Sequence, residues 1–180
     1  MLATTSGTTG GSKLIPINKS FRRDLADTSR AWLSGVFDDY PGAFDGYCFM
    51  PVSPAIEGVT ESGIPFGSMT GLTYQSAPWL FRRSYAVPYD AMLLENYDLR
   101  YYILMRFAVE KNVTLALTAN PSTWLRLAET GVNYGSAMVE GIHSGNLGAD
   151  LESTFEISDC DRAILARISA NLAPNPTRAT

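Results

Sequence analysis

The sequence predicts an α/β fold in which short β-strands alternate with helices. Apolar residues recur at helical spacing over residues 18–39 and again over 97–111, as expected of helices that bury one face. Two short apolar runs, 46–52 and 113–118, have the length and composition of buried strands. Strands that alternate with helices along one chain indicate an α/β arrangement.

The composition narrows the possible partners. The chain has 180 residues, of which 46% are hydrophobic and 18% charged, so it can bury a sizeable core, and we expect one domain spanning 1–180. The net charge of -4 and the pI near 4.9 argue against a nucleic-acid partner, which requires a basic surface. No apolar run approaches the length of a membrane span, so no membrane partner is expected either.

The first element is a loop rich in Gly, Ser and Thr, residues 5–13. Glycines let backbone N–H groups approach an anion, hydroxyl groups add donors, and an ammonium group adds a positive charge. The segment therefore predicts a phosphate-binding loop, with a flexible polar tail as the alternative. Its spacing is neither that of a Walker A loop nor that of a dinucleotide-binding fingerprint. The residues expected to bind phosphate groups are Ser6, Gly7, Thr8, Thr9, Gly10 and Lys13.

The elements that follow this loop are predicted from periodicity and capping residues. Residues 14–17 form a short apolar strand, and Asn18 can cap a long helix, 18–39. A strand at 46–52 comes next. Residues 53–89 are rich in Gly, Pro and Ser, and their apolar residues follow neither the helical nor the strand period. They are therefore predicted as a long irregular segment.

Residues 97–172 are predicted as a second α/β segment, made of a helix at 97–111, a strand at 113–118 and further helices. One of these helices begins at Pro121, and a separate one covers about 134–143, ended by Gly145. The last helix, 159–172, has Ser158 as its cap and Asp161 at the capping-box position.

A second Gly-rich run, 63–71, is a candidate for the substrate side of a site. It can shape a substrate pocket, and an ordinary surface loop explains it equally well. A further candidate, Asn120, lies where a strand ends and a helix begins, although helix capping is its preferred interpretation. The substrate-binding candidates are Gly63, Phe66, Gly67, Ser68 and Asn120.

Other chemistries find no support in the sequence. It contains no G-x-S-x-G pentapeptide for a serine hydrolase, and no His/Asp/Glu cluster with the spacing of metal ligands, so no metal-binding residue is assigned. His143, the one histidine, lies near a predicted helix end, where a positive charge is favoured. Cys48 and Cys160 are isolated, which suits a reducing compartment, so a cytoplasmic location is expected.

Short motifs in a fixed order carry a family resemblance over Leu33 through Glu129 and the loop before it. They are the Ser6–Lys13 loop with Ile15-Pro16, Pro51-Val52-Ser53-Pro54, Glu57-Gly58, Ser62-Gly63-Ile64-Pro65-Phe66-Gly67-Ser68, Ala86-Val87-Pro88, Tyr101-Tyr102, Phe107-Ala108, Val113-Thr114-Leu115 and Asn120-Pro121-Ser122-Thr123. In these residues the chain resembles bacterial members of the auxin-responsive-promoter family of acyl acid amido synthetases, which are adenylate-forming enzymes. The resemblance implies a fragment of the large N-terminal domain of such an enzyme.

The resemblance also implies a reaction. A carboxylic acid and ATP form an acyl adenylate and pyrophosphate with the help of Mg²⁺, and an amine or amino acid then displaces AMP to form an amide. The loop would bind the phosphates of ATP, because the charge that grows on pyrophosphate must be met by donors and cations.

The resemblance is incomplete, and two functions stay open. The family's adenine-binding loop, ribose-binding Asp and mobile C-terminal lobe have no counterpart after Asn120, and the subdomain that precedes the loop is missing as well. We therefore expect an internal piece of a larger synthetase, inactive alone. The alternative is a non-catalytic remnant, a binding or interaction domain that keeps the fold without turnover.

Overall fold

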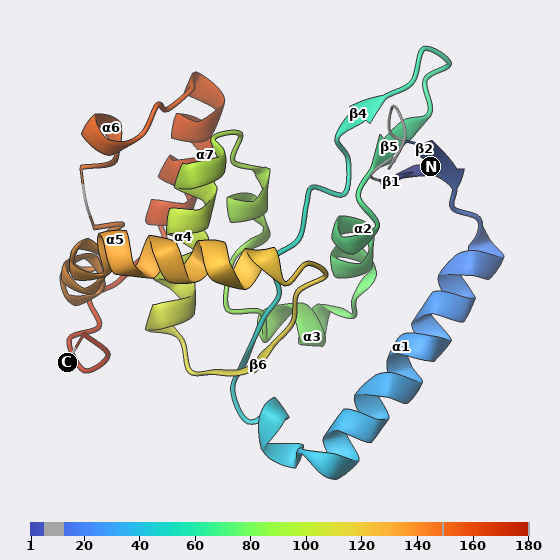
Figure 1. Ribbon diagram of the computed structural model, residues 1–180, viewed down its shortest axis with the longest axis horizontal. Coiled ribbons are helices and arrows are strands. Elements are labelled where there is room, and N and C mark those ends of the chain that lie inside the picture. Colours follow the sequence, from blue (N-terminus) through green and yellow to red (C-terminus); the bar gives the residue numbers. More distant parts are fainter. Residues whose placement is uncertain (6–12, 149, 180) are drawn as a thin grey trace. The chain divides into compact units, whose positions relative to one another are not determined.

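The computed structural model describes residues 1–5, 13–148 and 150–179, and these form short strands alternating with helices (Figure 1). The α/β class predicted from the sequence is confirmed. The chain divides into two compact units, of which unit 1 comprises Met1–Gly46 and Val52–Ser84, and unit 2 comprises Tyr47–Pro51 and Tyr85–Thr180. That the whole chain acts as a single domain stays a prediction.

Unit 1 contains a four-stranded sheet with the order β2-β1-β5-β4. Strands β1 and β2 are antiparallel with Thr5 opposite Lys13, whereas β1 and β5 are parallel with Ala3 opposite Gly67. Strands β4 and β5 are antiparallel. The elements of unit 1 are β1 (Leu2–Thr5), β2 (Lys13–Pro16), α1 (Lys19–Asp39), the 3-10 helix η1 (Pro41–Phe44), β4 (Gly58–Val59), β5 (Pro65–Gly67), α2 (Met69–Ser76) and α3 (Trp79–Arg83).

Helix α1 begins and ends as the sequence predicts. The Asn18 side chain accepts a hydrogen bond from the backbone N–H of Phe21 at 2.8 Å, which satisfies one of the first free donors of the helix. The helix ends at Asp39, and Pro41 begins η1. Although the helix carries apolar residues at helical spacing, none of its residues is buried.

Residues 53–89, for which no regular element is predicted, contain regular structure, so that prediction is wrong. They hold β4, β5, α2 and α3, and the 3-10 helix η2 (Tyr89–Leu93) begins at their last residue. These elements are two to eight residues long, too short for either hydrophobic period to emerge. The turn between β4 and β5 passes through Gly63, whose φ of +79° is a left-handed conformation that glycine adopts without strain.

Unit 2 is built around one buried helix, α4. Eight of its fourteen residues are buried, with Leu99, Tyr102 and Ile103 fully enclosed. Strands β3 and β6 pair in parallel beside it. The elements of unit 2 are β3 (Tyr47–Phe49), η2, α4 (Tyr97–Glu110), β6 (Val113–Ala116), α5 (Ser122–Ser144), α6 (Leu151–Thr154) and α7 (Asp159–Ser169).

Helix α5 is a single helix, so the prediction of separate helices from Pro121 and over 134–143 is wrong. Gly131, in its middle, lies where a Cβ atom would stand 3.1 Å from the Met105 Cε of α4. This glycine serves the close approach of two helices and does not interrupt α5. The predicted stop at Gly145 is confirmed, because that residue ends α5 with a φ of +74°.

The start of α7 differs from a capping box. Ser158 caps the helix as predicted and accepts a hydrogen bond from the Asp161 N–H at 3.1 Å. The Asp161 carboxylate is 1% exposed and accepts hydrogen bonds from the backbone N–H groups of Glu95 at 2.6 Å and Asn96 at 3.1 Å. Since these groups precede α4, Asp161 joins the beginnings of two helices.

Candidate functional site

The candidate site is the edge of the unit 1 sheet at which β1 and β5 end. The two strands are parallel and Ala3 pairs with Gly67, so Thr4 and Thr5 lie at the same end of the sheet as Ser68, the first residue after β5. In α/β folds ligands bind at the carboxyl ends of parallel strands. We call this region, formed by Thr4, Thr5, Lys13, Gly67 and Ser68, the carboxyl edge.

The two residues that bound the predicted phosphate loop in the sequence, Thr5 and Lys13, belong to this edge. Strand β1 ends at Thr5 and β2 begins at Lys13, and these two residues are direct partners in the antiparallel ladder. Lys13 is exposed, so its ammonium group can meet an anion from solvent. The other predicted phosphate ligands, Ser6, Gly7, Thr8, Thr9 and Gly10, lie outside the residues that the structure describes.

Thr4 contacts two other segments at the carboxyl edge, and the sequence does not predict these contacts. Its hydroxyl lies 3.0 Å from the Glu57 Oε2 atom and 3.2 Å from the Gly67 carbonyl oxygen. Glu57 comes just before β4 and Gly67 ends β5, so one threonine on β1 contacts two other segments of the sheet. No sequence signal identifies partners 53 and 63 residues away.

Ser68, a predicted substrate ligand, serves as the N-cap of α2. Its Oγ accepts a hydrogen bond from the Gly71 N–H at 2.9 Å and donates one to the Ser53 carbonyl at 2.8 Å. The first turn of α2 therefore lies beside the end of β1, and the partial positive charge of a helix N-terminus favours an anion in this region.

The other candidates of the second Gly-rich run have packing reasons for their residue types. A Cβ atom on Gly67 would lie 2.2 Å from the Ala55 carbonyl oxygen, and one on Gly58 would lie 2.6 Å from the Phe66 ring. Gly67 and Gly58 thus allow the 55–58 segment to pack closely on β5 and on the Phe66 ring, and Gly63 forms the turn. Their role in substrate binding stays a prediction.

Asn120 belongs to unit 2, apart from the other candidates, and its side chain acts at the start of α5. The Oδ1 atom accepts hydrogen bonds from the Ser122 backbone N–H at 3.0 Å and the Ser122 hydroxyl at 2.9 Å. Pro121 is the N-cap residue of α5 and makes no side-chain cap bond, so the prediction of Asn120 as the cap is wrong, and its side chain forms a turn one residue before the cap. A direct role for Asn120 toward a substrate stays a prediction.

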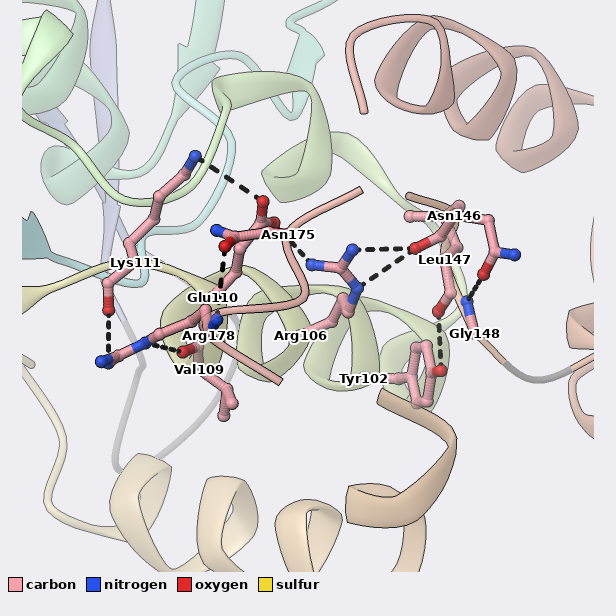
Figure 2. Close-up of polar contacts among 10 residues, drawn as sticks. All are labelled: Tyr102, Arg106, Val109, Glu110, Lys111, Asn146, Leu147, Gly148, Asn175 and Arg178. Carbon is pink, nitrogen blue, oxygen red and sulfur yellow. Dashed lines mark hydrogen bonds and ion pairs between the residues drawn. The ribbon is translucent and has the colours of Figure 1, made fainter. Parts of the chain in front are cut away.

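The buried pair Arg106 and Glu110 of α4 lies within a cluster of polar contacts (Figure 2). Arg106, fully buried, lies 2.6 Å from the Glu110 carboxylate and donates two hydrogen bonds to the Asn146 carbonyl. The Tyr102 hydroxyl donates to the Leu147 carbonyl at 2.7 Å, and Arg178 donates to the carbonyls of Val109 and Lys111. These bonds attach the segment after α5 and the C-terminal segment to α4, so the cluster has a structural role.

The described part of the chain offers no other reactive centre. It holds no group of three His, Cys, Asp or Glu side chains arranged to bind a metal ion. Burial raises the pKa of the Cys48 thiol to about 11, which keeps it protonated and unreactive at neutral pH. Among the helices formed by residues 1–5, 13–148 and 150–179, none combines the length and apolar character needed to cross a membrane.

In unit 1, two parallel strands end at the carboxyl edge and the N-terminus of a helix follows the second of them. The chain belongs to the GH3 family, because the model of the GH3 family N-terminal domain matches residues 1–180. The family resemblance read from the sequence motifs is therefore confirmed.

Two solved structures share the fold. One is described as GH3.15 acyl acid amido synthetase, with a TM-score of 0.69, 19% identity and coverage of 99% of this chain. The other is AtGH3.15 acyl acid amido synthetase in complex with 2,4-DB, with a TM-score of 0.64, 18% identity and the same coverage. The chain spans 30% of the length of each. Comparison of the sequence with curated proteins gives no significant match.

Proposed function

We propose that this chain is the acyl- and phosphate-binding part of an ATP-dependent acyl acid amido synthetase. In the proposed reaction a small carboxylic acid and ATP, with Mg²⁺, form an acyl adenylate, and an amine or amino acid then takes the acyl group. The observation that carries the proposal is the pairing of Thr5 with Lys13, which brackets the Gly/Ser/Thr loop at the carboxyl edge of a GH3-family domain.

The chemistry of the carboxyl edge supports phosphate binding. Lys13 brings a positive charge to one end of the loop, and the N-terminus of α2 adds oriented backbone donors beside the end of β1. Donors and cations of this kind stabilise the negative charge that develops on a leaving pyrophosphate group. A Mg²⁺ ion that bridges phosphates keeps several waters and needs only one or two protein carboxylates, so a cluster of protein ligands is not required.

The first test measures phosphate binding by the purified chain. We expect ATP with Mg²⁺, or pyrophosphate with Mg²⁺, to raise its unfolding temperature, since a ligand at a hundred times its Kd stabilises a fold by about 2.7 kcal/mol. Lys13→Ala should abolish the shift because it removes the point charge, while Lys19→Ala, an exposed lysine at the start of α1, should retain it. An unchanged unfolding temperature with both ligands would support the non-catalytic remnant instead.

The second test concerns turnover. We expect the chain alone to catalyse no acid-dependent exchange of pyrophosphate into ATP, because it spans 30% of the length of the synthetases it resembles in fold. Exchange that depends on both the chain and a carboxylic acid would overturn this expectation of inactivity. Lys13→Ala, run in parallel, reports whether any exchange observed belongs to the loop.

We also propose a cytoplasmic location. Cys48 and Cys160 are both free thiols, one buried and one exposed, as expected in a reducing compartment. Fractionation of cells that produce the chain tests this location, and recovery with membranes or in the periplasm or medium would contradict it.

A further inference from the structure

The sheet of unit 1 brings a carboxylate to the carboxyl edge. Strand β4 is antiparallel to β5 and begins where β5 ends, so Glu57, the residue before β4, lies beside Gly67. The Glu57 N–H donates a hydrogen bond to the Phe66 carbonyl at 2.8 Å, which continues the pairing of the two strands. In the sheet order β2-β1-β5-β4, Lys13 begins one outer strand and Glu57 precedes the other.

Thr4 orients the Glu57 side chain. Strand β5 lies between β1 and β4, yet the Thr4 hydroxyl is 3.0 Å from the Glu57 Oε2 atom, so the carboxylate reaches across β5 to the end of β1. Successive residues of a strand point to opposite faces of the sheet. Glu57 therefore meets the end of β1 from one face, while Lys13, the direct partner of Thr5, meets it from the other.

The negative charge of Glu57 has no cationic partner in the described part of the chain. No Lys, Arg or His side chain within residues 1–5, 13–148 and 150–179 forms an ion pair with it. An unpaired carboxylate repels a phosphate group that binds nearby, whereas a cation between the two groups attracts both. A carboxylate in this position thus favours phosphate that arrives with a metal ion over phosphate that arrives without one.

The oxygen atoms of Glu57 suit Mg²⁺. This ion prefers oxygen ligands, keeps several waters and takes one or two carboxylates together with the phosphates of a substrate. An ionised carboxylate offers about four lone-pair positions, of which the Thr4 hydroxyl occupies at most one. Glu57 therefore retains acceptor positions for a cation.

We propose that Glu57 is a protein ligand of Mg²⁺ at the carboxyl edge and makes phosphate binding there selective for the Mg²⁺ complex. Glu57 can do this only if phosphate groups bind at the same edge, so the proposal rests on the proposed function. Thr4 is a positioning residue that holds the carboxylate at the end of β1. Lys13 attracts phosphate with or without Mg²⁺, whereas Glu57 attracts the complex and repels the bare anion.

Calorimetric titration of the purified chain with pyrophosphate, in excess Mg²⁺ or in EDTA, tests the charge of Glu57. We expect the natural chain to bind the Mg²⁺ complex at least about tenfold more tightly than the bare anion. Glu57→Gln removes the charge and keeps an oxygen that can accept from Thr4. It should bind the complex several-fold more weakly and the bare anion more tightly. Glu61→Gln, between β4 and β5, is the matched control with the same change in net charge, and should bind as the natural chain does.

Two further variants separate the position of the carboxylate from its charge. Thr4→Val removes the hydroxyl and keeps the charge of Glu57, so it should weaken binding of the complex without strengthening binding of the bare anion. Lys13→Ala should weaken binding of both forms. Equal weakening of both forms in Glu57→Gln, or an unchanged preference for the Mg²⁺ complex, overturns the proposal.

Mn²⁺ provides a readout that does not depend on comparing affinities. It accepts the same oxygen ligands as Mg²⁺, and its unpaired electrons broaden the NMR signals of nearby nuclei. With Mn²⁺ and pyrophosphate, the backbone amide signals of Glu57 and Gly58 should broaden more than those of Ser62 and Gly63, and Glu57→Gln should remove this difference. Equal broadening of the two segments in the natural chain overturns the proposal.

Failure of this proposal can be told apart from failure of the proposed function. Pyrophosphate binding that depends on Lys13, with a preference for Mg²⁺ that does not depend on Glu57, contradicts the role of Glu57 and leaves the phosphate site in place. A natural chain that binds pyrophosphate neither with Mg²⁺ nor with EDTA contradicts both.

Discussion

Helices α1 and α4 begin in the same way and differ in what they bury. Each starts with an asparagine whose side chain accepts a hydrogen bond from a backbone N–H three residues on. Helix α4 buries eight of fourteen residues, whereas α1 buries none of twenty-one. A good cap and a helical pattern determine where a helix starts, and tertiary packing determines how much it contributes to stability. We therefore expect unit 2 to hold most of the stability of the chain, and the carboxyl edge to lie in the less stable unit 1.

The largest expected effect comes from the buried pair of α4. Glu110→Ala leaves the Arg106 guanidinium without its carboxylate in a site closed to solvent, and we expect a loss of about 3–5 kcal/mol in unfolding free energy. The exposed pair of α1 provides the comparison, since Asp27→Ala should cost about 0.5 kcal/mol or less. Urea unfolding measures both, and equal losses would contradict the difference between the helices.

A purely apolar truncation gives the next largest effect. Ile103→Ala removes a fully buried side chain, and we expect a loss of about 2–5 kcal/mol. Phe21→Ala, on the exposed face of α1, should change the unfolding free energy of the monomer by less than about 0.5 kcal/mol. Thermal unfolding at low protein concentration tests this, and a large effect of Phe21→Ala would show that α1 is covered within the monomer.

The contact between α7 and the start of α4 should have an intermediate effect. Asp161→Ala removes the acceptor for two backbone N–H groups, and we expect a loss of about 1–3 kcal/mol. Asp161→Asn retains one carboxamide oxygen as an acceptor and should lose less. Hydrogen exchange at Glu95 and Asn96 provides the local measurement, and unchanged protection in Asp161→Ala would contradict the assigned contact.

A smaller effect is expected at the caps. Asn18→Ala should lower the local stability of α1 by about 1 kcal/mol, visible as faster hydrogen exchange in its first turn. Asn96→Ala should lower the local stability of α4 by more than this, because the Asn96 side chain also donates to the Glu156 carbonyl at 2.8 Å. If both substitutions lowered local stability equally, the extra hydrogen bond of Asn96 would contribute no stability to α4.

A last effect is absent at neutral pH and is a pH dependence of unit 2 under alkaline conditions. The pKa of Cys48 is raised from 9.0 to about 11 because burial disfavours the thiolate, so the unfolded chain loses this proton first as the pH rises. The contribution of Cys48 to stability is therefore constant below about pH 9 and falls between pH 9 and 11. Cys48→Ala should flatten this part of the profile, and at pH 8 a thiol reagent should modify Cys160 of the folded chain far faster than Cys48.

The sequence predicted best those elements whose signals are local. The boundaries of α1 and α4, the cap at Ser158 and the stop at Gly145 all follow from residues within a few positions of the helix ends. Gly131 lies within α5 where that helix closely approaches Met105 of α4, and strand β5 within 53–89 pairs with the distant β1. No local pattern contains that information.

The candidate site also contains features that local sequence predicts and features that depend on tertiary pairing. The composition of the loop predicted Lys13 as a phosphate ligand, which stays a prediction, while strand β1 was not predicted. The resemblance supplied the family that the comparisons confirm. The link from Thr4 to Glu57 and Gly67 was missed, since it depends on the parallel pairing of strands more than sixty residues apart. Sequence patterns can identify the chemistry of a loop, while tertiary pairing determines what surrounds it.

The carboxylate of Asp161 also has a consequence for the order of events during protein synthesis. Glu95 and Asn96 leave the ribosome 66 and 65 residues before the side chain that accepts their hydrogen bonds. Until α7 has been translated, the backbone donors that precede α4 have only water as a partner. Completion of the unit 2 core thus awaits the last part of the chain, and a nascent polypeptide stalled before residue 161 should remain open to a protease near the start of α4.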